Sequence, residues 1–233
     1  MAKIVALIMA AGSGERFSGK GPKTLFPLLG VPTVVWSARR FARHPAVDSI
    51  VVVAAPGEEE RIRSTLDDHR VGKIARVATG GPTRQESVRL GLETLDADCG
   101  FVLIHDAARP CVGADLIGGV IGALSAGGAV VPVLPAVDTL VRESDGAVDA
   151  ILDRVHISGV QTPQGFRAAL AVSAHRSAKA KGLTSSDDGS LVFALGEKVK
   201  TIVGERTNIK ITYPEDAPIA EAILRAAFAG EEA

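Results

Sequence analysis

Short apolar runs alternate with amphipathic segments along the chain from Ile4 to Val133. The apolar runs have the length of buried strands, and the segments between them repeat apolar residues at helical spacing. The predicted strands are Ile4–Met9, Ile50–Ala54, Ile74–Ala78, Phe101–Ile104 and Ala129–Val133. The predicted helices are Thr33–Arg43, Glu58–His69, Thr83–Leu95 and Asp115–Leu124. This order indicates βαβ units, so we predict an α/β fold with a Rossmann-like, mostly parallel sheet flanked by helices.

The alternation changes after Val133. β-branched residues stand on both sides of the turn signal Ser144-Asp145-Gly146, which predicts strands Thr139–Arg142 and Ala147–Asp153. We expect them to form a protruding β-hairpin arm, residues 135–157, within a single domain of residues 1–233. Beyond it the pattern predicts helices near Gly165–Ala180 and Asp187–Ala194, a strand Lys198–Val203 and a last helix from Pro214.

The arm is rich in apolar residues for a hairpin in water. A two-stranded hairpin is marginal by itself, and pairing with the same arm of a second chain would bury its apolar side chains. We therefore predict a homodimer through the β-arm; the alternative is an arm folded back on its own domain. The apolar residues concerned are Val137, Leu140, Val141, Val148 and Ile151.

Composition and charge bear on the partners of the protein and on its cellular compartment. A formal net charge of -1 and a pI near 6.5 argue against a nucleic-acid partner, because chains that wrap nucleic acid are normally basic. No stretch reaches the ~20 apolar residues of a membrane span, and the apolar start meets a glycine loop where a signal peptide has its cleavage site. Cys99 and Cys111 are too few for a disulfide framework. We expect a cytoplasmic protein without a membrane partner.

A glycine loop with two cations follows the first predicted strand. It reads Ala10-Ala-Gly-Ser-Gly-Glu-Arg16 and continues to Gly21-Pro-Lys23. Glycine permits close backbone approach, and successive amides of such a loop bind anions. Arg16 and Lys23 would add charge to the same anion, as a triphosphate requires. The loop lacks the P-loop Gly-Lys-Ser/Thr and the third glycine of the dinucleotide fingerprint. A plain strand-to-helix turn with two solvated cations is the alternative.

A second motif, Gly80-Gly-Pro-Thr-Arg84-Gln-Glu-Ser87, follows the third strand. Arg84 and Ser87 are three residues apart, so a helix places them on one face. The two glycines leave backbone groups open for hydrogen bonds to a base edge. The alternative is a glycine turn before a helix N-terminus, without a ligand.

The third motif, His105-Asp-Ala-Ala-Arg-Pro110, follows the fourth strand. Asp106 stands at a strand end, where open α/β sheets bind their ligands, and a carboxylate beside a triphosphate can bind Mg²⁺. Arg109 would position the loop or a phosphate. The alternative is a capping aspartate with a surface arginine. His105 is assigned to structure, because no serine or carboxylate suggests a triad.

The glycine loop resembles the signature of the nucleotidyltransferases that activate sugar and alcohol phosphates. The second and third motifs resemble the 2-C-methyl-D-erythritol 4-phosphate cytidylyltransferase family, which has Gly-Gly-x-x-Arg-x-x-Ser and His-Asp-Ala-Ala-Arg-Pro in this order. The resemblance spans nearly the whole chain. It continues through Asp138-Thr139, Asp153-Arg154, Gln161-Thr-Pro-Gln164, Asn208-Ile-Lys210-Ile-Thr212 and Pro214-Glu-Asp216.

The resemblance implies CMP transfer from CTP, the co-substrate, to methylerythritol phosphate, with Mg²⁺ as cofactor. The implied catalytic residues are Arg16, Lys23 and Lys210. The implied residues for CTP and its metal are Ala10, Ala11, Gly12, Gly14, Gly81, Arg84, Ser87 and Asp106, with Asp106 as the metal ligand. The implied acceptor residues are Asp106, Arg109, Thr139, Arg154, Thr162, Ser186 and Lys210. The family resemblance also supports the dimer, with Thr139 reaching the partner's acceptor site.

The chain departs from the family pattern at two places. Pro82-Thr83 replaces an acidic or small polar residue near the base, and Ser186 replaces a threonine before an acidic pair. Three other functions remain open. A ribitol-5-phosphate cytidylyltransferase would share most motifs, and an inactive nucleotide-binding regulator would need fewer cations at one phosphate. A nicotinamide-dependent dehydrogenase would fit the fold class, but the chain lacks the dinucleotide-binding fingerprint that such an enzyme needs.

Overall fold

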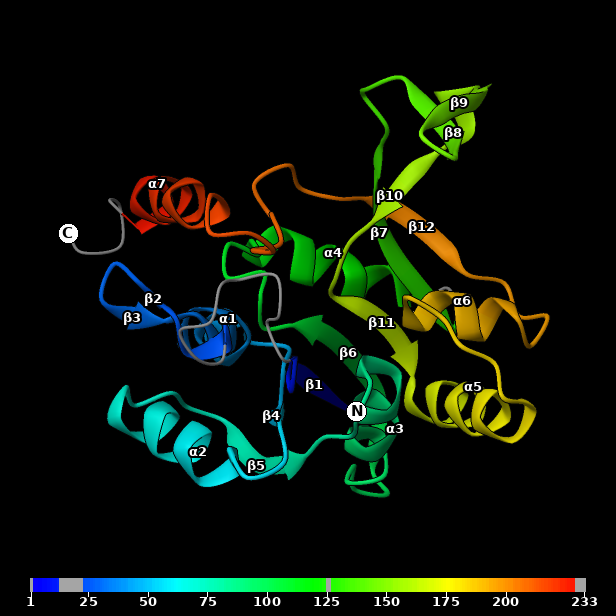
Figure 1. Ribbon diagram of the computed structural model, residues 1–233. Coiled ribbons are helices and arrows are strands. Elements are labelled where there is room, and N and C mark those ends of the chain that lie inside the picture. The colour runs from blue at the N-terminus through cyan, green and yellow to red at the C-terminus, as the bar shows by residue number, and fades with distance from the viewer. Residues whose placement is uncertain (1, 13–22, 125–126, 229–233) are drawn as a thin grey trace.

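The structure is a computed structural model that describes residues 2–12, 23–124 and 127–228. Its centre is an eight-stranded sheet in the order β10-β7-β11-β6-β1-β4-β5, with β12 on the other edge of β7 (Figure 1). β1, β4, β5 and β6 pair in parallel, as do β7 and β12, whereas β10 and β11 are antiparallel to their neighbours. The strands are β1 Lys3–Ala10, β4 Ser49–Ala54, β5 Ile74–Thr79, β6 Cys99–Asp106, β7 Ala129–Pro135, β10 Ser158–Val160, β11 Gln164–Arg167 and β12 Lys200–Val203.

Helices cover both faces of the sheet, because successive residues of each central strand point to opposite sides. Along β1, Ala6 and Ile8 belong to the core under α1, α2 and α4, whereas Leu7 and Met9 belong to the core under α3, α5 and α6. A third, smaller core joins α7 to the β2–β3 hairpin. These elements are α1 Thr33–Arg43, α2 Glu59–Asp68, α3 Arg84–Leu92, α4 Ala114–Leu124, α5 Ala168–Lys181, α6 Asp188–Phe193, α7 Asp216–Phe228, β2 Pro27–Leu28 and β3 Val31–Pro32.

The predicted α/β fold with a mostly parallel sheet is confirmed, but some predicted boundaries are wrong. The last helix begins at Asp216 rather than at Pro214. The helix expected from Gly165 begins at Ala168, because residues 164–167 form β11 between β6 and β7. Gly165 lets α4 approach this strand closely: a Cβ atom there would lie 2.6 Å from Cγ1 of Val120. The short strands β10 and β11 were not predicted, because strands of this length leave no periodic pattern.

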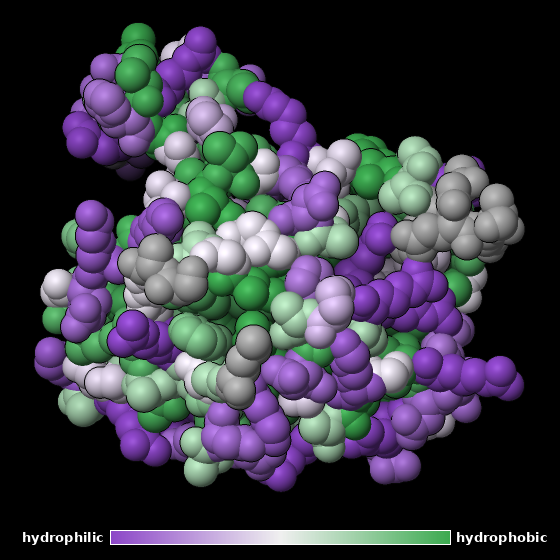
Figure 2. All heavy atoms as spheres, turned by 180° about the vertical axis from the view of Figure 1, so that it is seen from behind, coloured by the Kyte–Doolittle hydropathy of each residue, from purple (hydrophilic) through white to green (hydrophobic). Residues whose placement is uncertain are grey.

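The predicted hairpin is present as β8 (Leu140–Ser144) and β9 (Ala147–Leu152). Asp145 and Gly146 both have positive φ, at 52° and 75°, which is the backbone of a two-residue Asp-Gly hairpin turn. The hairpin extends away from the sheet and forms a separate lobe of the surface (Figures 1 and 2). Val141 and Ile151 lie opposite each other on the two strands of the hairpin, and they are 45% and 74% exposed.

Both cysteines are free: Cys111 is buried and Cys99 is partly buried. In the described ranges, no helix has the length and apolar character needed to cross a membrane.

Candidate active site

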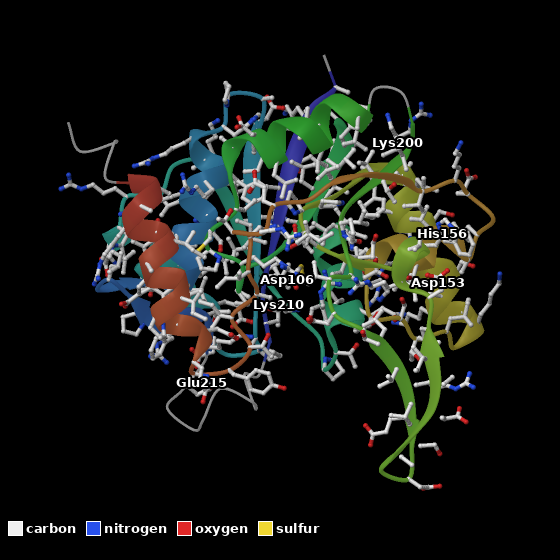
Figure 3. The ribbon with its side chains drawn as sticks, turned by 90° about the horizontal axis from the view of Figure 1, so that it is seen from above. Asp106, Asp153, His156, Lys200, Lys210 and Glu215 are labelled. Atoms are coloured by element: carbon white, nitrogen blue, oxygen red, sulfur yellow. The ribbon has the colours of Figure 1, made fainter. Side chains whose placement is uncertain are left out.

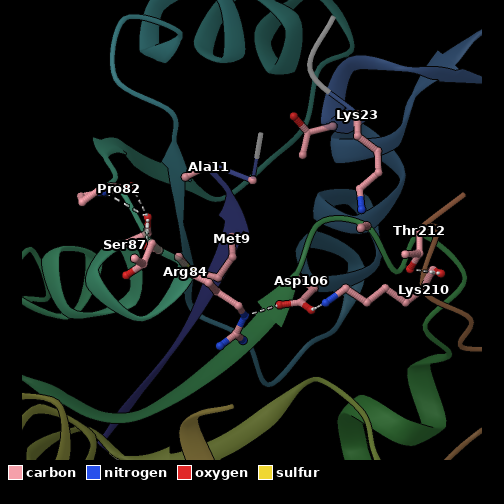
Figure 4. A pocket seen from close by; sticks show the side chains of 14 residues that line it. Met9, Ala11, Lys23, Pro82, Arg84, Ser87, Asp106, Lys210 and Thr212 are labelled. Carbon is pink, nitrogen blue, oxygen red and sulfur yellow. Dashed lines mark hydrogen bonds and ion pairs between the residues drawn. The ribbon is translucent and has the colours of Figure 1, made fainter. Parts of the chain in front are cut away.

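A pocket of about 410 Å³ lies at the carboxyl ends of β1 and β6 (Figure 4). The two strands run in parallel with Met9 opposite Asp106, so the chain segments that follow them meet at one edge of the sheet. Segments far apart in sequence complete the wall. Its lining residues are Met9, Ala11, Gly12, Lys23, Thr24, Gly81, Pro82, Thr83, Arg84, Ser87, Asp106, Ala108, Lys210 and Thr212.

Only the two ends of the glycine loop belong to the described residues. Ala11 and Gly12 line the pocket, whereas Ala10 is buried and accepts a hydrogen bond from Oγ1 of Thr24 through its carbonyl. Gly14 and Arg16 lie outside the described residues. Beyond the loop, Lys23 lines the pocket and donates from Nζ to the carbonyl oxygen of Ile211 at 2.6 Å.

Asp106 lies between two cations. One carboxylate oxygen is 2.9 Å from Nε of Arg84, and the other is 2.7 Å from Nζ of Lys210. Burial alone would raise the pKa of Asp106, but the charges of Arg84 and Lys210 hold this pKa well below its ordinary value. The pocket therefore contains an ionised carboxylate with two cations at fixed positions, as Figure 4 shows.

Arg84 also contacts a second carboxylate that sequence reasoning did not assign to the site. Its Nη2 is 2.9 Å from Oδ2 of Asp188, at the start of α6. The other oxygen of Asp188 is 3.1 Å from Nε2 of His175, on α5. The sequence signal was the acidic pair 187–188 after a polar loop, which we noted only beside Ser186.

The Gly80–Ser87 motif forms a tight turn before α3. Ser87 is buried; its hydroxyl accepts from the amide of Gly81 at 2.9 Å and donates to the carbonyl of Thr83 at 2.8 Å. Thr83 caps the helix by accepting from the amide of Glu86. At Gly81 a Cβ atom would lie 2.5 Å from Cγ of Glu86. The motif therefore forms the glycine turn before a helix N-terminus that was the alternative interpretation, and its residues also line the pocket.

The segment carrying Lys210 is attached to the end of β6 by hydrogen bonds. The amide of Ile211 donates to the carbonyl of Ala108, and Nη1 of Arg109 donates to the carbonyl of Asn208 at 2.7 Å. Asn208 is buried, and its side chain donates to the carbonyl of Thr162 at 2.8 Å. Arg109 therefore positions this segment.

Thr162 is buried rather than on the pocket wall. Its hydroxyl accepts from the amide of Asp106 and contacts Nδ1 of His105, each at 3.1 Å. The ring of His105 donates from Nε2 to the carbonyl of Arg109. His105 thus has the structural role that the sequence predicted, and Thr162 supports the strand end that bears Asp106.

The remaining residues expected at the acceptor site lie apart from the pocket wall. Thr139 and Ser186 are exposed, and Arg154 donates to the carbonyl of Val137 within the arm. Figure 3 shows Asp106 beside Lys210, while Asp153, the neighbour of Arg154, lies at the base of the arm. Within this chain, the pocket brings together Lys23, Arg84, Asp106 and Lys210, but not the arm residues.

The described residues offer Mg²⁺ one carboxylate in this pocket. No group of three or more histidine, cysteine or acidic side chains suitable for a metal occurs in the described part of the chain. Both oxygens of Asp106 are already paired with cations. Mg²⁺ is commonly held by one or two carboxylates together with substrate phosphates, and only this kind of metal site fits the residues present.

The chain is similar to known proteins over nearly its whole length. The family model IspD, 2-C-methyl-D-erythritol 4-phosphate cytidylyltransferase, matches residues 4–226. A protein of that name from Pelotomaculum thermopropionicum is 42% identical over 229 residues, covering 97% of this chain and 96% of the relative. The one from Geobacillus kaustophilus is 38% identical over 224 residues, covering 96% and 98%.

Solved structures give the same result. The 4-diphosphocytidyl-2C-methyl-D-erythritol synthase of Anaerococcus prevotii superposes with a TM-score of 0.83 at 32% identity, covering 96% of both chains. The 2-C-methyl-D-erythritol 4-phosphate cytidylyltransferase of Thermus thermophilus gives 0.79 at 37% identity, covering 94% of this chain and 98% of the other. The chain belongs to the 2-C-methyl-D-erythritol 4-phosphate cytidylyltransferase family.

Proposed function

We propose that this protein transfers CMP from CTP to 2-C-methyl-D-erythritol 4-phosphate, giving 4-diphosphocytidyl-2-C-methyl-D-erythritol and pyrophosphate. The family match over residues 4–226 supports this reaction. The observation that carries the proposal is the pocket at the ends of β1 and β6, where Arg84 and Lys210 pair with the carboxylate of Asp106 and Lys23 lines the same wall. Such a wall suits two substrates that both carry phosphate.

The reaction is an in-line displacement at the α-phosphorus of CTP. An oxygen of the acceptor phosphate forms the new P–O bond as the bond to pyrophosphate breaks. The acceptor is already an anion, so the protein needs no nucleophile of its own, and catalysis rests on positioning and charge stabilisation. Lys23 and Arg16 would meet the charge at the α-phosphate, and Lys210 would hold the acceptor phosphate. Ala11, Gly12 and Gly14 would hold the triphosphate, and Gly81, Arg84 and Ser87 would hold the cytidine.

Mg²⁺ would be held by Asp106 together with the triphosphate oxygens. When bound, it would neutralise phosphate charge. Asp106 would then exchange part of its pairing with Lys210 for the metal, because Lys210 has oxygens of the acceptor phosphate to pair with in the loaded pocket.

The arm would complete the acceptor site in a homodimer. Thr139 and Arg154 lie outside this chain's own pocket wall, and the arm extends into solvent with exposed Val141 and Ile151. An isologous contact would bury these side chains and bring the arm to the partner's acceptor phosphate. The free cysteines suit a reducing compartment, so the enzyme would work in the cytoplasm.

A pyrophosphate-release assay tests the function. The purified protein is given CTP and Mg²⁺ with methylerythritol phosphate, with ribitol 5-phosphate, or with no acceptor. We expect release with methylerythritol phosphate and far less with ribitol phosphate. The reverse preference would identify a ribitol-5-phosphate cytidylyltransferase. CTP binding without turnover on either acceptor would identify a nucleotide-binding regulator and overturn the proposal.

A further inference from the structure

A row of alternating charges runs from the pocket into the protein interior. It begins at Lys210 and passes through Asp106 and Arg84 to Asp188, with contacts of 2.7, 2.9 and 2.9 Å. His175 closes the row at its buried end. Its members come from five separate segments of the chain, so packing of the whole domain sets their spacing. The proposed chemistry uses the pocket half of this row and leaves the inner half unexplained.

The inner half is built more rigidly than the pocket half. The side chains of Asp188 and His175 are each 2% exposed, against 29% for Arg84 and 40% for Lys210. The amide of Asp188 donates to Oε1 of Gln164 on β11, which fixes the start of α6. The carboxylate of Asp188 therefore cannot turn toward water, and a buried carboxylate is stable only while it stays paired.

Two carboxylates determine where the guanidinium of Arg84 lies. Nε donates to Asp106 and Nη2 donates to Asp188. A planar guanidinium presents its donors in a fixed fork, so two anchors on different segments fix both its position and its plane. With Asp106 as its only anchor, the guanidinium of Arg84 could swing toward the phosphates. The anchor at Asp188 prevents this movement.

We propose that Asp188 and His175 are positioning residues that hold Arg84, and through Arg84 the carboxylate of Asp106, in the geometry required for cytidylyl transfer. This role rests on the proposed function of the pocket. Asp188 acts on Arg84 directly, whereas His175 acts on Asp188: a carboxylate only accepts hydrogen bonds, so Nε2 of His175 is the donor. Neither residue lines the pocket.

The first test removes the charge of Asp188 and keeps its shape. Asp188→Asn should lower kcat/KM per folded molecule by about 10- to 100-fold, because small misplacements in an active site have effects of this size. Asp187→Asn is the matched control: it makes the same change one residue away, on a carboxylate that caps α6 and accepts from Gln164, whereas Arg84 donates to Asp188. Equal activity of Asp188→Asn and the wild type, per folded molecule, would overturn the proposal.

A double-mutant cycle separates positioning from general stability. If Asp188 acts through Arg84, Asp188→Asn should cause no further loss of activity in an Arg84→Gln background. Independent, multiplying losses would show that Asp188 acts by another route and would overturn the proposal.

His175 gives a second comparison. His175→Gln keeps a donor near Nε2 and should retain activity, whereas His175→Phe fills the space without a donor and should behave like Asp188→Asn.

A spectroscopic measurement is independent of turnover. In arginine-labelled protein, the Nε proton of Arg84, assigned by its loss in Arg84→Gln, should exchange slowly with water because it donates to Asp106. Exchange should be faster in Asp188→Asn and unchanged in Asp187→Asn. If the wild type releases no pyrophosphate, the proposed function fails, while this measurement still reports on Arg84. Unchanged exchange in Asp188→Asn would overturn the positioning role even in an active enzyme.

Discussion

At the scale of single residues, the pocket depends on side chains whose partners fix them before any ligand enters. Lys23 donates to the carbonyl of Ile211, and Lys210 pairs with Asp106, so the two lysines are connected through one short segment. Preorganised charges of this kind need no rearrangement when charge develops in the transition state. Their removal should therefore affect turnover more than ground-state binding.

Lys23→Ala tests this expectation. We expect kcat to fall by roughly 10²–10³-fold, the usual cost of losing one electrostatic donor in an active site, with a smaller change in CTP affinity. Steady-state kinetics and calorimetric CTP binding measure the two quantities. Lys200→Ala removes an exposed lysine on β12, away from the pocket (Figure 3), and should change neither. Turnover of Lys23→Ala close to that of the wild type would remove the glycine loop from the proposed chemistry.

His105 makes stability depend on pH. Burial lowers its pKa from the ordinary 6.5 to about 4, so between these values the unfolded chain binds a proton that the folded protein does not. Stability from this residue is then fully present above pH 6.5 and is lost as the pH falls toward 4, by on the order of 3 kcal/mol. Urea unfolding across this range should show the loss, and it should be smaller in His105→Gln. An identical pH dependence in both proteins would contradict the assignment.

At the scale of elements, β11 is held by neighbours on three sides. It pairs with β6 on one side and β7 on the other, and Gly165 lies beneath α4. Val120 and Leu124, which a new methyl group would meet, are both buried, so they have little room to move. The absence of a side chain at Gly165 thus determines how closely helix and sheet pack.

Gly165→Ala should lower the free energy of unfolding by about 1–3 kcal/mol, the usual effect of overpacking a core. Gly159→Ala on β10 is a suitable control, because a Cβ atom there would have no neighbour within 4 Å. Its effect should stay within about 0.5 kcal/mol. Chemical denaturation of both variants measures the difference. Equal stabilities would mean that α4 shifts freely on the sheet.

Periodicity predicted the elements that are long and regular, and spacing predicted the site only where it follows a strand. β1, β4 and β6 are continuous apolar runs, and Asp106 directly follows such a run. β10 and β11 are too short to leave a pattern, and Gln164 gives no sign that it ends a loop and enters the sheet. Asp188 was not assigned to the site because its partners, Arg84 and His175, are distant in sequence, and pairwise contacts of this kind depend on tertiary packing.

At the scale of the whole molecule, two sets of residues implied by the family resemblance lie apart. One set, with Lys23, Asp106 and Lys210, lines the pocket, and the other, Thr139 and Arg154, lies on the arm. The arm's cross-strand pair Val141–Ile151 leaves apolar surface in solvent, although β-branched residues stabilise a hairpin best when their faces are covered. Dimerisation would cover this surface and join the two sets of residues in one site.

Ile151→Asp should therefore separate the protomers. A carboxylate in place of the most exposed residue of this pair would be buried without a partner in the dimer, so the dimer should dissociate in sedimentation velocity at concentrations where the wild type is dimeric. The KM for the acceptor should rise at least about tenfold, since contacts to a charged group contribute roughly 1.5–3 kcal/mol, while CTP binding is kept. Asp149→Asn changes only an exposed ion pair with Arg142 and should preserve the dimer and the activity. A wild-type protein that sediments as a fully active monomer would contradict both the dimer and the shared acceptor site.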